Sequence, residues 1–288
     1  MMKNMKKYIL LTTAIFTLLF APSCSDYLDI VPDDIATIDN AFSIRSQAEK
    51  YLFTCYSYMP SHGLIENNPA IVGGDELYIT TSFRSASHAH AWYIAHGTQS
   101  ASNPRCDYWR GTNGAKDLYQ AISDCNIFIE NIHKVPDMTQ DERNRWTAEV
   151  KFLKAYYHFW LIRMYGPIPI KDKNVPVNAG EEQIKAYRDP LDDCFKYVID
   201  LLDEIIDSGY LPDKILMEAE ELGRITKGIA LTAKAEILLT AASPLFNGNT
   251  DYRGLKDNRG IEIFNPDKTE EQRKQRWVDA AEACRVAI

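Results

Sequence analysis

The residues best suited to chemistry or ligand binding are concentrated between Pro60 and Gly114. This stretch lacks helical periodicity, and it holds four of the six histidines of the chain. A loop this long inside a compact domain is usually functional. Its histidines are His62, His88, His90 and His96, its aromatic residues include Tyr78, Phe83, Trp92, Tyr93, Tyr108 and Trp109, and its arginines are Arg84, Arg105 and Arg110.

Metal binding and catalysis are the first two functions to weigh for this region. His88 and His90 would share one face of a strand and, with His96, could offer imidazoles to zinc or copper; scattered surface histidines are the alternative that we favour. Asp75 and Glu76 lack the alternating oxygen pattern of calcium-binding loops. The sequence contains no nucleophile elbow, Gly-rich phosphate loop or His-Glu-x-x-His motif. We therefore expect no metal site, no cofactor and no enzymatic activity.

Another reactive group is the thiol of Cys24, which follows an apolar N-terminal segment. Three lysines precede the apolar run at residues 9–21, and small residues end it. Spanning a membrane takes about 20 apolar residues, so this layout favours a secretory signal peptide. In a lipoprotein precursor, a diacylglyceryl group alkylates the cysteine after such residues; here the usual leucine is displaced to Leu18 and Leu19. We predict a lipoprotein signal peptide at residues 1–23 and lipidation at Cys24, with plain secretion as the alternative.

Composition narrows the class of protein. The 288 residues carry a net charge of −8, which becomes more negative once the lysines of the signal peptide are removed. No basic block is present, which disfavours a nucleic-acid partner. Residues 24–38 are acidic and interrupted by proline, as in a hydrated tether. The remaining five cysteines show no Cys-x-x-Cys spacing; buried free thiols are expected, with one disulfide as the alternative.

Helical periodicity dominates the rest of the chain. Apolar residues recur at helical spacing within residues 39–59, 114–133, 139–165, 189–209, 226–244 and 277–288. We expect Asp39 and Thr226 to cap helices, Thr139 and Glu142 to form a capping box, and Asp189 to cap a helix with Pro190 in its first turn. Residues 168–173 and 261–264 could form short edge strands. The predicted class is all-α with long loops.

The helices also show signs of pairing. Small residues that face aromatic ones in antiparallel helix pairs are typical of tetratricopeptide repeats. Residues 226–239 with 277–288, and 139–165 with the helix after 189, have this character, although long loops break the 34-residue period. The last helical pattern runs to the final residue without a cap, so we expect a longer protein.

Three stretches resemble the SusD/RagB family of outer-membrane nutrient-binding lipoproteins. They are CSDYLDIVP at residues 24–32, EVKFLKAYYHFWLIRMYGPIPI at 149–170, and KAEILLTAASPLFN at 234–247 followed by Trp277-x-x-Ala-Ala. The second is similar to the family's Glu-x-x-x-x-Arg-Ala helix that ends in Tyr-Gly-x-x-Pro, with Lys154 where arginine is common. The resemblance spans nearly all of the mature chain, and family members are usually longer.

The resemblance implies a fold and a function. Residues 39–288 would form an α-helical domain of antiparallel helix pairs with tetratricopeptide-like repeats and long ligand-binding loops, truncated at its C-terminus. The protein would be anchored through Cys24 to outer-membrane lipid, exposed at the cell surface, and partnered with a SusC-like TonB-dependent transporter. It would bind oligosaccharides and would not be an enzyme. Capture of peptides or another nutrient, and a tetratricopeptide-type assembly scaffold, remain as alternatives.

Under this resemblance, the long loop is the predicted glycan site. Sugars present C–H faces that aromatic rings cover and hydroxyl edges that polar side chains satisfy. The candidate ligand-binding residues are Arg84, Trp92, Tyr93, Asn103, Tyr108 and Trp109. The alternative is that the aromatic residues anchor the loop on the helices. We expect Trp92 to face solvent from an extended segment, with Tyr93 pointing the other way.

Overall fold

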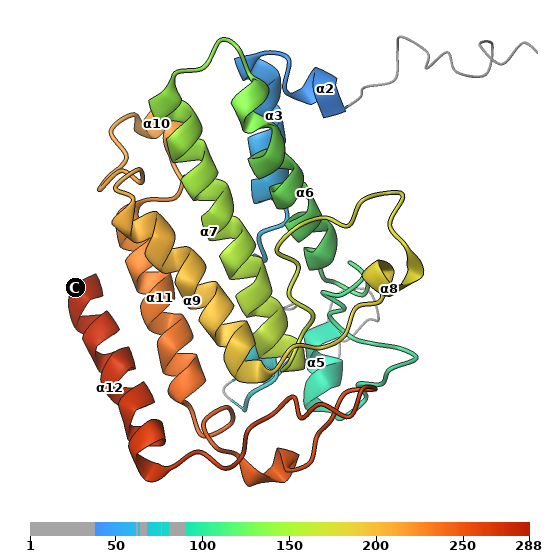
Figure 1. Ribbon diagram of the computed structural model, residues 1–288. Helices are drawn as coiled ribbons and strands as arrows, with labels where there is room; N and C mark the ends of the chain where they lie inside the picture. Colours follow the sequence, from blue (N-terminus) through green and yellow to red (C-terminus); the bar gives the residue numbers. More distant parts are fainter. Residues whose placement is uncertain (1–37, 62, 64–67, 76, 81–89) are drawn as a thin grey trace, which may run out of the picture. The chain divides into compact units, whose positions relative to one another are not determined.

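The structure is a computed structural model that describes residues 38–61, 63, 68–75, 77–80 and 90–288 (Figure 1). The predicted signal peptide, Cys24, the tether up to residue 37, Arg84 and His88 lie outside these residues. The chain divides into two units, Met1–Ile38 and Asp39–Ile288. No helix within the described ranges is both long enough and apolar enough to cross a membrane.

The described residues form helices and no strands, as the all-α prediction requires. The helices are α2 (Ile38–Ala41), α3 (Arg45–Ser57), α4 (Pro69–Val72), α5 (His90–Ala95), α6 (Leu118–Asn131), α7 (Gln140–Tyr165), α8 (Glu181–Ile184), α9 (Leu191–Asp207), α10 (Glu218–Glu221), α11 (Lys227–Ala242) and α12 (Glu270–Ala287). Two 3-10 turns lie at Ile132–Lys134 and Thr250–Tyr252.

Helix α7 is the centre of the core, and its sequence sets both of its ends. The predicted capping box is present: the Thr139 hydroxyl accepts from the Glu142 amide, and the Glu142 carboxylate accepts from the Thr139 amide. At the other end, the helix stops at Gly166, whose φ of 70° is a left-handed value that glycine adopts readily. Most side chains of α7 between these caps are buried, so the helix is covered on nearly every side.

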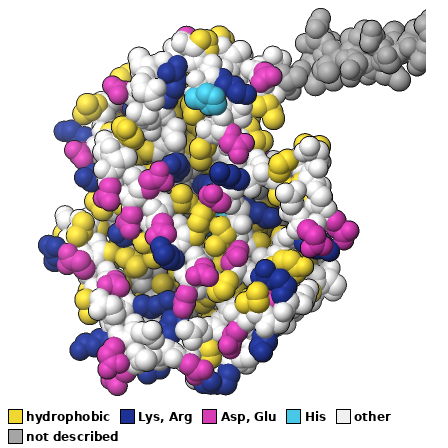
Figure 2. All heavy atoms as spheres, in the orientation of Figure 1, with side chains coloured by type: hydrophobic (Ala, Val, Ile, Leu, Met, Phe, Trp, Pro, Cys, Tyr) yellow, Lys and Arg dark blue, Asp and Glu magenta, His cyan; other side chains and the backbone are white. Residues whose placement is uncertain are grey.

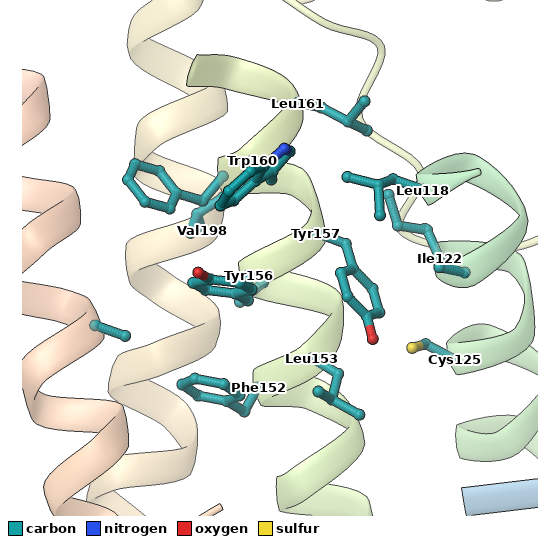
Figure 3. Packing of buried hydrophobic residues seen from close by; sticks show 14 of the residues in the cluster. Leu118, Ile122, Cys125, Phe152, Leu153, Tyr156, Tyr157, Trp160, Leu161 and Val198 are labelled. Carbon is teal, nitrogen blue, oxygen red and sulfur yellow. The ribbon is translucent and has the colours of Figure 1, made fainter. Parts of the chain in front are cut away.

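Two faces of α7 pack against two different helices (Figure 3). On one side, Leu153, Tyr157 and Leu161 point toward α6, which presents Leu118, Ile122 and Cys125. On the other side, Phe152, Tyr156 and Trp160 point toward α9, which contributes Val198. Full burial of a large apolar side chain contributes about 1.5–3 kcal/mol. This double-sided packing therefore makes α7 the main source of hydrophobic stabilisation.

Neighbouring helices run antiparallel, in the tetratricopeptide-like pairing that the sequence predicts. Helix α7 packs against α9, and α11 packs against α12 (Figure 1). Helix α11 begins at the Thr226 cap, and its alanines Ala230, Ala233 and Ala241 are buried. These small side chains permit the close approach of the partner helices.

Several predicted details were wrong. Asp39 lies inside α2, and the N-cap of α3 is Ile44, which makes no side-chain cap. Asp189 does not cap α9, because its carboxylate accepts a hydrogen bond from the Ile170 amide instead. Residues 168–173 form no strand, and the segment 261–264 contributes only an isolated bridge between Lys256 and Glu262.

The two ends of the helical prediction also need correction. The stretch from Pro60 to Gly114 was predicted to have no helix, but it contains α4 and α5, which are too short to show a period. In α12, Ala280 alone is buried, and Trp277 is 47% exposed. The apolar stripe predicted there is mostly uncovered because α12 packs mainly on α11.

A buried ion-pair cluster joins α3, α7 and the connection between α10 and α11. The Glu149 carboxylate is fully buried and accepts from two Arg224 nitrogens at 2.9 and 3.0 Å. It also accepts from Arg145 at 3.1 Å and from the Tyr56 hydroxyl at 2.7 Å. Paired and hydrogen-bonded in this way, the buried charge is tolerated, and it fixes the chain entering α11.

A further polar cluster fixes the chain that leaves α7. The Lys154 ammonium is buried and donates to the backbone oxygen of Asp172 at 2.6 Å and to its carboxylate at 3.1 Å. Tyr197 donates to the same carboxylate. His158 lies between the Lys154 oxygen and the Lys171 amide, and burial lowers its pKa to about 4. Lys154, the departure from the family's arginine, is thus a well-bonded core residue.

The cysteines of the described residues are free thiols. Cys55, Cys106, Cys125 and Cys194 are buried, and Cys284 is partly exposed. Burial raises the pKa of the Cys106 thiol to about 11 and that of Cys194 to about 12. These side chains therefore pack as small neutral groups.

Candidate functional site

The segment Cys106–Asp117 is held in one conformation by its own hydrogen bonds. The buried Asp107 carboxylate accepts from the Trp109 amide at 3.1 Å and from the Thr112 hydroxyl at 3.3 Å. Gly111 has a φ of 70°, and a Cβ there would come within 2.8 Å of the Asp117 backbone nitrogen. Only glycine fits this turn.

The end of this segment is continuous with helix α6. The Asp117 carboxylate caps the helix by accepting from the Gln120 amide at 2.9 Å, and the Leu118 amide donates to the Tyr108 oxygen at 3.0 Å. The segment between α5 and α6 is therefore positioned by the helical scaffold, although it contains little regular structure itself.

Tyr108 and Trp109 connect this segment to the end of α7. The Tyr108 ring is buried and lies 5.4 Å from the Trp160 ring. The half-buried Trp109 ring contacts Tyr119 at 4.8 Å and Tyr165 at 5.5 Å, both edge to face. The Arg188 guanidinium lies 5.9 Å from the Trp109 ring centre. Burial raises the pKa of Tyr165 to about 12, so its hydroxyl stays neutral.

A cavity of about 560 Å³, here called the loop cavity, lies between the end of α3 and this segment. Its lining includes Tyr58, Met59, Tyr108, Arg110, Lys116 and Asp117. The Tyr58 ring is fixed because its hydroxyl donates to Asp124 at 2.8 Å. Arg110 and Lys116 are exposed and form no ion pair within the described part of the chain. The loop cavity thus combines aromatic walls with polar groups that are available to a ligand.

A second cavity of about 360 Å³, here called the α7-end cavity, lies where α7 stops. Its lining includes Arg163, Tyr165, Arg188, Leu245, Tyr252 and Phe264. Tyr252 is 42% exposed and packs against Phe264 at 5.0 Å. Sequence spacing does not reveal this cavity, because Tyr165 ends α7 whereas Phe246, Tyr252 and Phe264 come from the α11–α12 connection, far along the chain. Tyr252, placed between two glycines in a polar loop, was the available signal.

The structure distributes the predicted ligand-binding residues unevenly. Tyr108 lines the loop cavity, and Trp109 lies beside it in the chain. Tyr93 is half-buried under the Arg105 guanidinium, which lies 4.5 Å from its ring centre. Asn103 is exposed. Arg84 lies outside the described residues, so its part in the site stays a prediction.

The expectation that Trp92 faces solvent from an extended segment was wrong. Trp92 belongs to α5 and is 8% exposed. Its ring packs against Tyr78 at 5.6 Å and His96 at 4.2 Å, and it lines neither cavity. A helical turn brings Trp92 and His96, four residues apart, into contact, whereas in a strand they would lie roughly 13 Å apart.

Metal ligation finds no geometric support within the described ranges, where no group of three His, Cys, Asp or Glu side chains could hold an ion. His90 is buried, and its pKa is lowered by burial and by the nearby Arg105 charge. His88, the other half of the His-x-His pattern, lies outside the described residues.

The sequence matches the SusD-like family described as "Starch-binding associating with outer membrane" over residues 26–230. The match covers well over half of the chain, and the chain belongs to this family. No curated protein matches the sequence.

Solved structures share the fold. The protein BT4246 is 30% identical with a TM-score of 0.70, and the match covers 85% of this chain and 39% of that one. A SusD-like protein from Bacteroides fragilis is 24% identical with a TM-score of 0.54, covering 72% of this chain and 38% of its own. Surface glycan-binding protein A from Bacteroides thetaiotaomicron, in complex with laminarihexaose, is 19% identical with a TM-score of 0.52, covering 70% and 40%. The chain therefore spans about two-fifths of the length of these relatives.

Proposed function

We propose that this protein is a cell-surface lipoprotein that captures oligosaccharides and delivers them to a SusC-like TonB-dependent transporter in the outer membrane. It acts by binding, not by catalysis. The observation that carries the proposal is the loop cavity. Aromatic side chains line it, together with cations that form no ion pair with any described residue, in a chain of a family described as starch-binding. A relative with this fold has been solved with laminarihexaose bound.

The chemistry of the loop cavity suits a sugar. Ring faces of pyranoses pack on aromatic side chains, and buried hydroxyls need hydrogen-bond partners. The half-buried Tyr58 supplies a ring, the buried Tyr108 forms part of the wall, and Arg110 and Lys116 supply donors. Ligand sites typically enclose about 300–1,000 Å³, a range that includes the 560 Å³ of the loop cavity. The half-buried Trp109 contacts Tyr165 and Arg188, which line the α7-end cavity.

Filling the loop cavity tests this assignment. Ser57 is exposed at the end of α3 and lines the cavity, so a Ser57→Trp side chain would occupy it. Thr54, one turn earlier and also exposed, does not line it, which makes Thr54→Trp a matched control. Isothermal calorimetry on the full-length protein, with an oligosaccharide identified on a glycan array, should show at least about tenfold weaker binding for Ser57→Trp only. Equal affinity in both variants would place the ligand elsewhere.

The anchor and the domain boundaries belong to the same proposal. Residues 1–23 would be removed as a signal peptide, Cys24 would carry the lipid, and residues 24–38 would lead to the domain at 39–288. One acyl chain binds membranes only marginally, whereas several anchor a protein durably. Cys24→Ala should therefore abolish incorporation of labelled palmitate and shift the protein to the soluble fraction. Palmitate incorporation into the variant would refute this anchor.

A further inference from the structure

Positive charge is concentrated around the two cavities that flank Trp109. The loop cavity is lined by Arg110 and Lys116, and the α7-end cavity by Arg163 and Arg188. Among the described residues that line the two cavities, Asp117 is the single carboxylate. The chain as a whole has 32 basic and 40 acidic side chains. Basic side chains therefore outnumber acidic ones in these linings, although they are the minority in the whole chain.

The neighbouring carboxylates are already engaged by the protein. Asp117 caps α6 through the Gln120 amide. The buried Asp107 accepts from Trp109 and Thr112. Glu236 pairs with Arg163 at 3.1 Å. The other three cations of the linings, Arg110, Lys116 and Arg188, form no ion pair in the described structure. Arg110 and Lys116 in the loop cavity and Arg188 above Trp109 are thus available to an external anion.

Other parts of the surface do not share this bias. A cavity of about 450 Å³ among α9, α11 and α12 is lined by Lys234, Asp279 and Glu282, so acidic groups outnumber basic ones. A groove of about 530 Å³ beside α7 and α11 has Glu236 as its one charged lining residue. On the face shown in Figure 2, acidic and basic side chains are interspersed. The positive lining is therefore a property of the cavities near Trp109.

We infer that this site selects oligosaccharides that carry anionic groups, namely uronate carboxylates or sulfate esters, over neutral ones. The inference rests on the proposed function, because it names the class of glycan for the same site. Arginine binds carboxylates and sulfates through parallel N–H donors, and such charge-assisted hydrogen bonds are roughly twice as strong as neutral ones. Aromatic rings beside these cations bind the sugar face, so both parts of a charged sugar have partners.

The test uses matched pairs of oligosaccharides with the full-length protein. Oligogalacturonides are compared with their methyl esters, and sulfated oligosaccharides with their desulfated counterparts. Calorimetry should show binding at least about tenfold tighter for the charged member of a pair. This preference should shrink as sodium chloride rises, because exposed charges are screened. The two pairs distinguish carboxylate from sulfate as the preferred group.

Charge-removal variants identify the residues responsible. Arg110→Gln with Lys116→Gln should abolish the preference for the charged member while leaving the melting temperature unchanged, since neither side chain makes a hydrogen bond or ion pair in the described structure. Lys214→Gln with Lys274→Gln is the control, because both lysines are exposed, form no ion pair with a described residue and are absent from the two linings. The control should keep the preference.

Each outcome has a defined meaning. Equal affinity for charged and neutral members overturns this inference and leaves the proposed glycan capture intact. A charge preference that survives in the Arg110/Lys116 variant overturns the assignment to the loop cavity. Failure of the folded protein to bind any oligosaccharide of the array or the panel overturns the proposed function itself.

Discussion

Helix α7 and the chain between α5 and α6 are both rich in aromatic residues, but they use them differently. In α7, Tyr157 and Trp160 are buried by facing helices on two sides. Between α5 and α6, Trp109 is half-buried and lies beside cavities. The difference lies in what surrounds each ring. Neighbouring helices cover α7 along most of its length, whereas the segment between α5 and α6 is covered only where it contacts the helices.

This contrast explains where stability and binding should reside. The buried side chains of α7 stabilise the fold, and the helical scaffold positions the segment Cys106–Asp117. Substitutions in α7 should therefore change the free energy of unfolding, whereas exposed substitutions around the loop cavity should change affinity.

Leu153→Ala should produce the largest loss of stability. Leu153 is fully buried between α7 and α6, so truncation leaves a cavity and should cost about 2–5 kcal/mol. Gln140→Ala, at an exposed position of the same helix, should change stability by less than about 0.5 kcal/mol. Chemical denaturation of both variants measures the difference. A Leu153→Ala protein as stable as wild type would mean that α7 is not the core.

Acid should weaken the fold through His158. The folded protein keeps this buried imidazole neutral down to a pKa of about 4, whereas an unfolded histidine takes up a proton near pH ~6.5. As the pH falls between these values, the unfolded state binds the proton first, so stability decreases by roughly 1.4 kcal/mol per pH unit. His158→Asn should lose this part of the pH dependence, whereas exposed His133→Asn should retain it. Identical slopes in all three proteins would contradict the assignment.

Trp92→Ala should lower stability and leave ligand affinity unchanged. The ring is buried in the short helix α5 and lines neither cavity, so its loss should cost roughly 0.5–3 kcal/mol. Trp277→Ala, in which the ring is 47% exposed, should cost less. Melting curves compare the two variants. Weaker glycan binding at an unchanged melting temperature for Trp92→Ala would restore Trp92 as a binding residue.

The sequence predicted the long helices well because their signals are local. Thr139, Glu142 and Thr226 form the expected caps, and the periodicity of α7 and α9 identifies buried faces. Asp189 was misassigned because its carboxylate bonds Ile170, a partner that sequence spacing does not reveal. Trp277 was placed on a buried stripe, but burial also needs a neighbouring helix to cover it.

The candidate site was only partly predictable. The long segment before α6 was identified from its composition, and Tyr108 does line a cavity there. Trp92 was misjudged because a six-residue helix has too few turns to show its period. The α7-end cavity could not be seen in the sequence, since Tyr165 and Tyr252 are brought together only by the packing of the helices.

The most direct test of glycan capture at the Trp109 region is a crystal structure of the full-length protein with an oligosaccharide that it binds in solution. The account predicts sugar rings in the loop cavity, in contact with Tyr58 or Tyr108 and within hydrogen-bonding distance of Arg110 or Lys116. An oligosaccharide bound solely elsewhere, such as in the cavity among α9, α11 and α12, would contradict it.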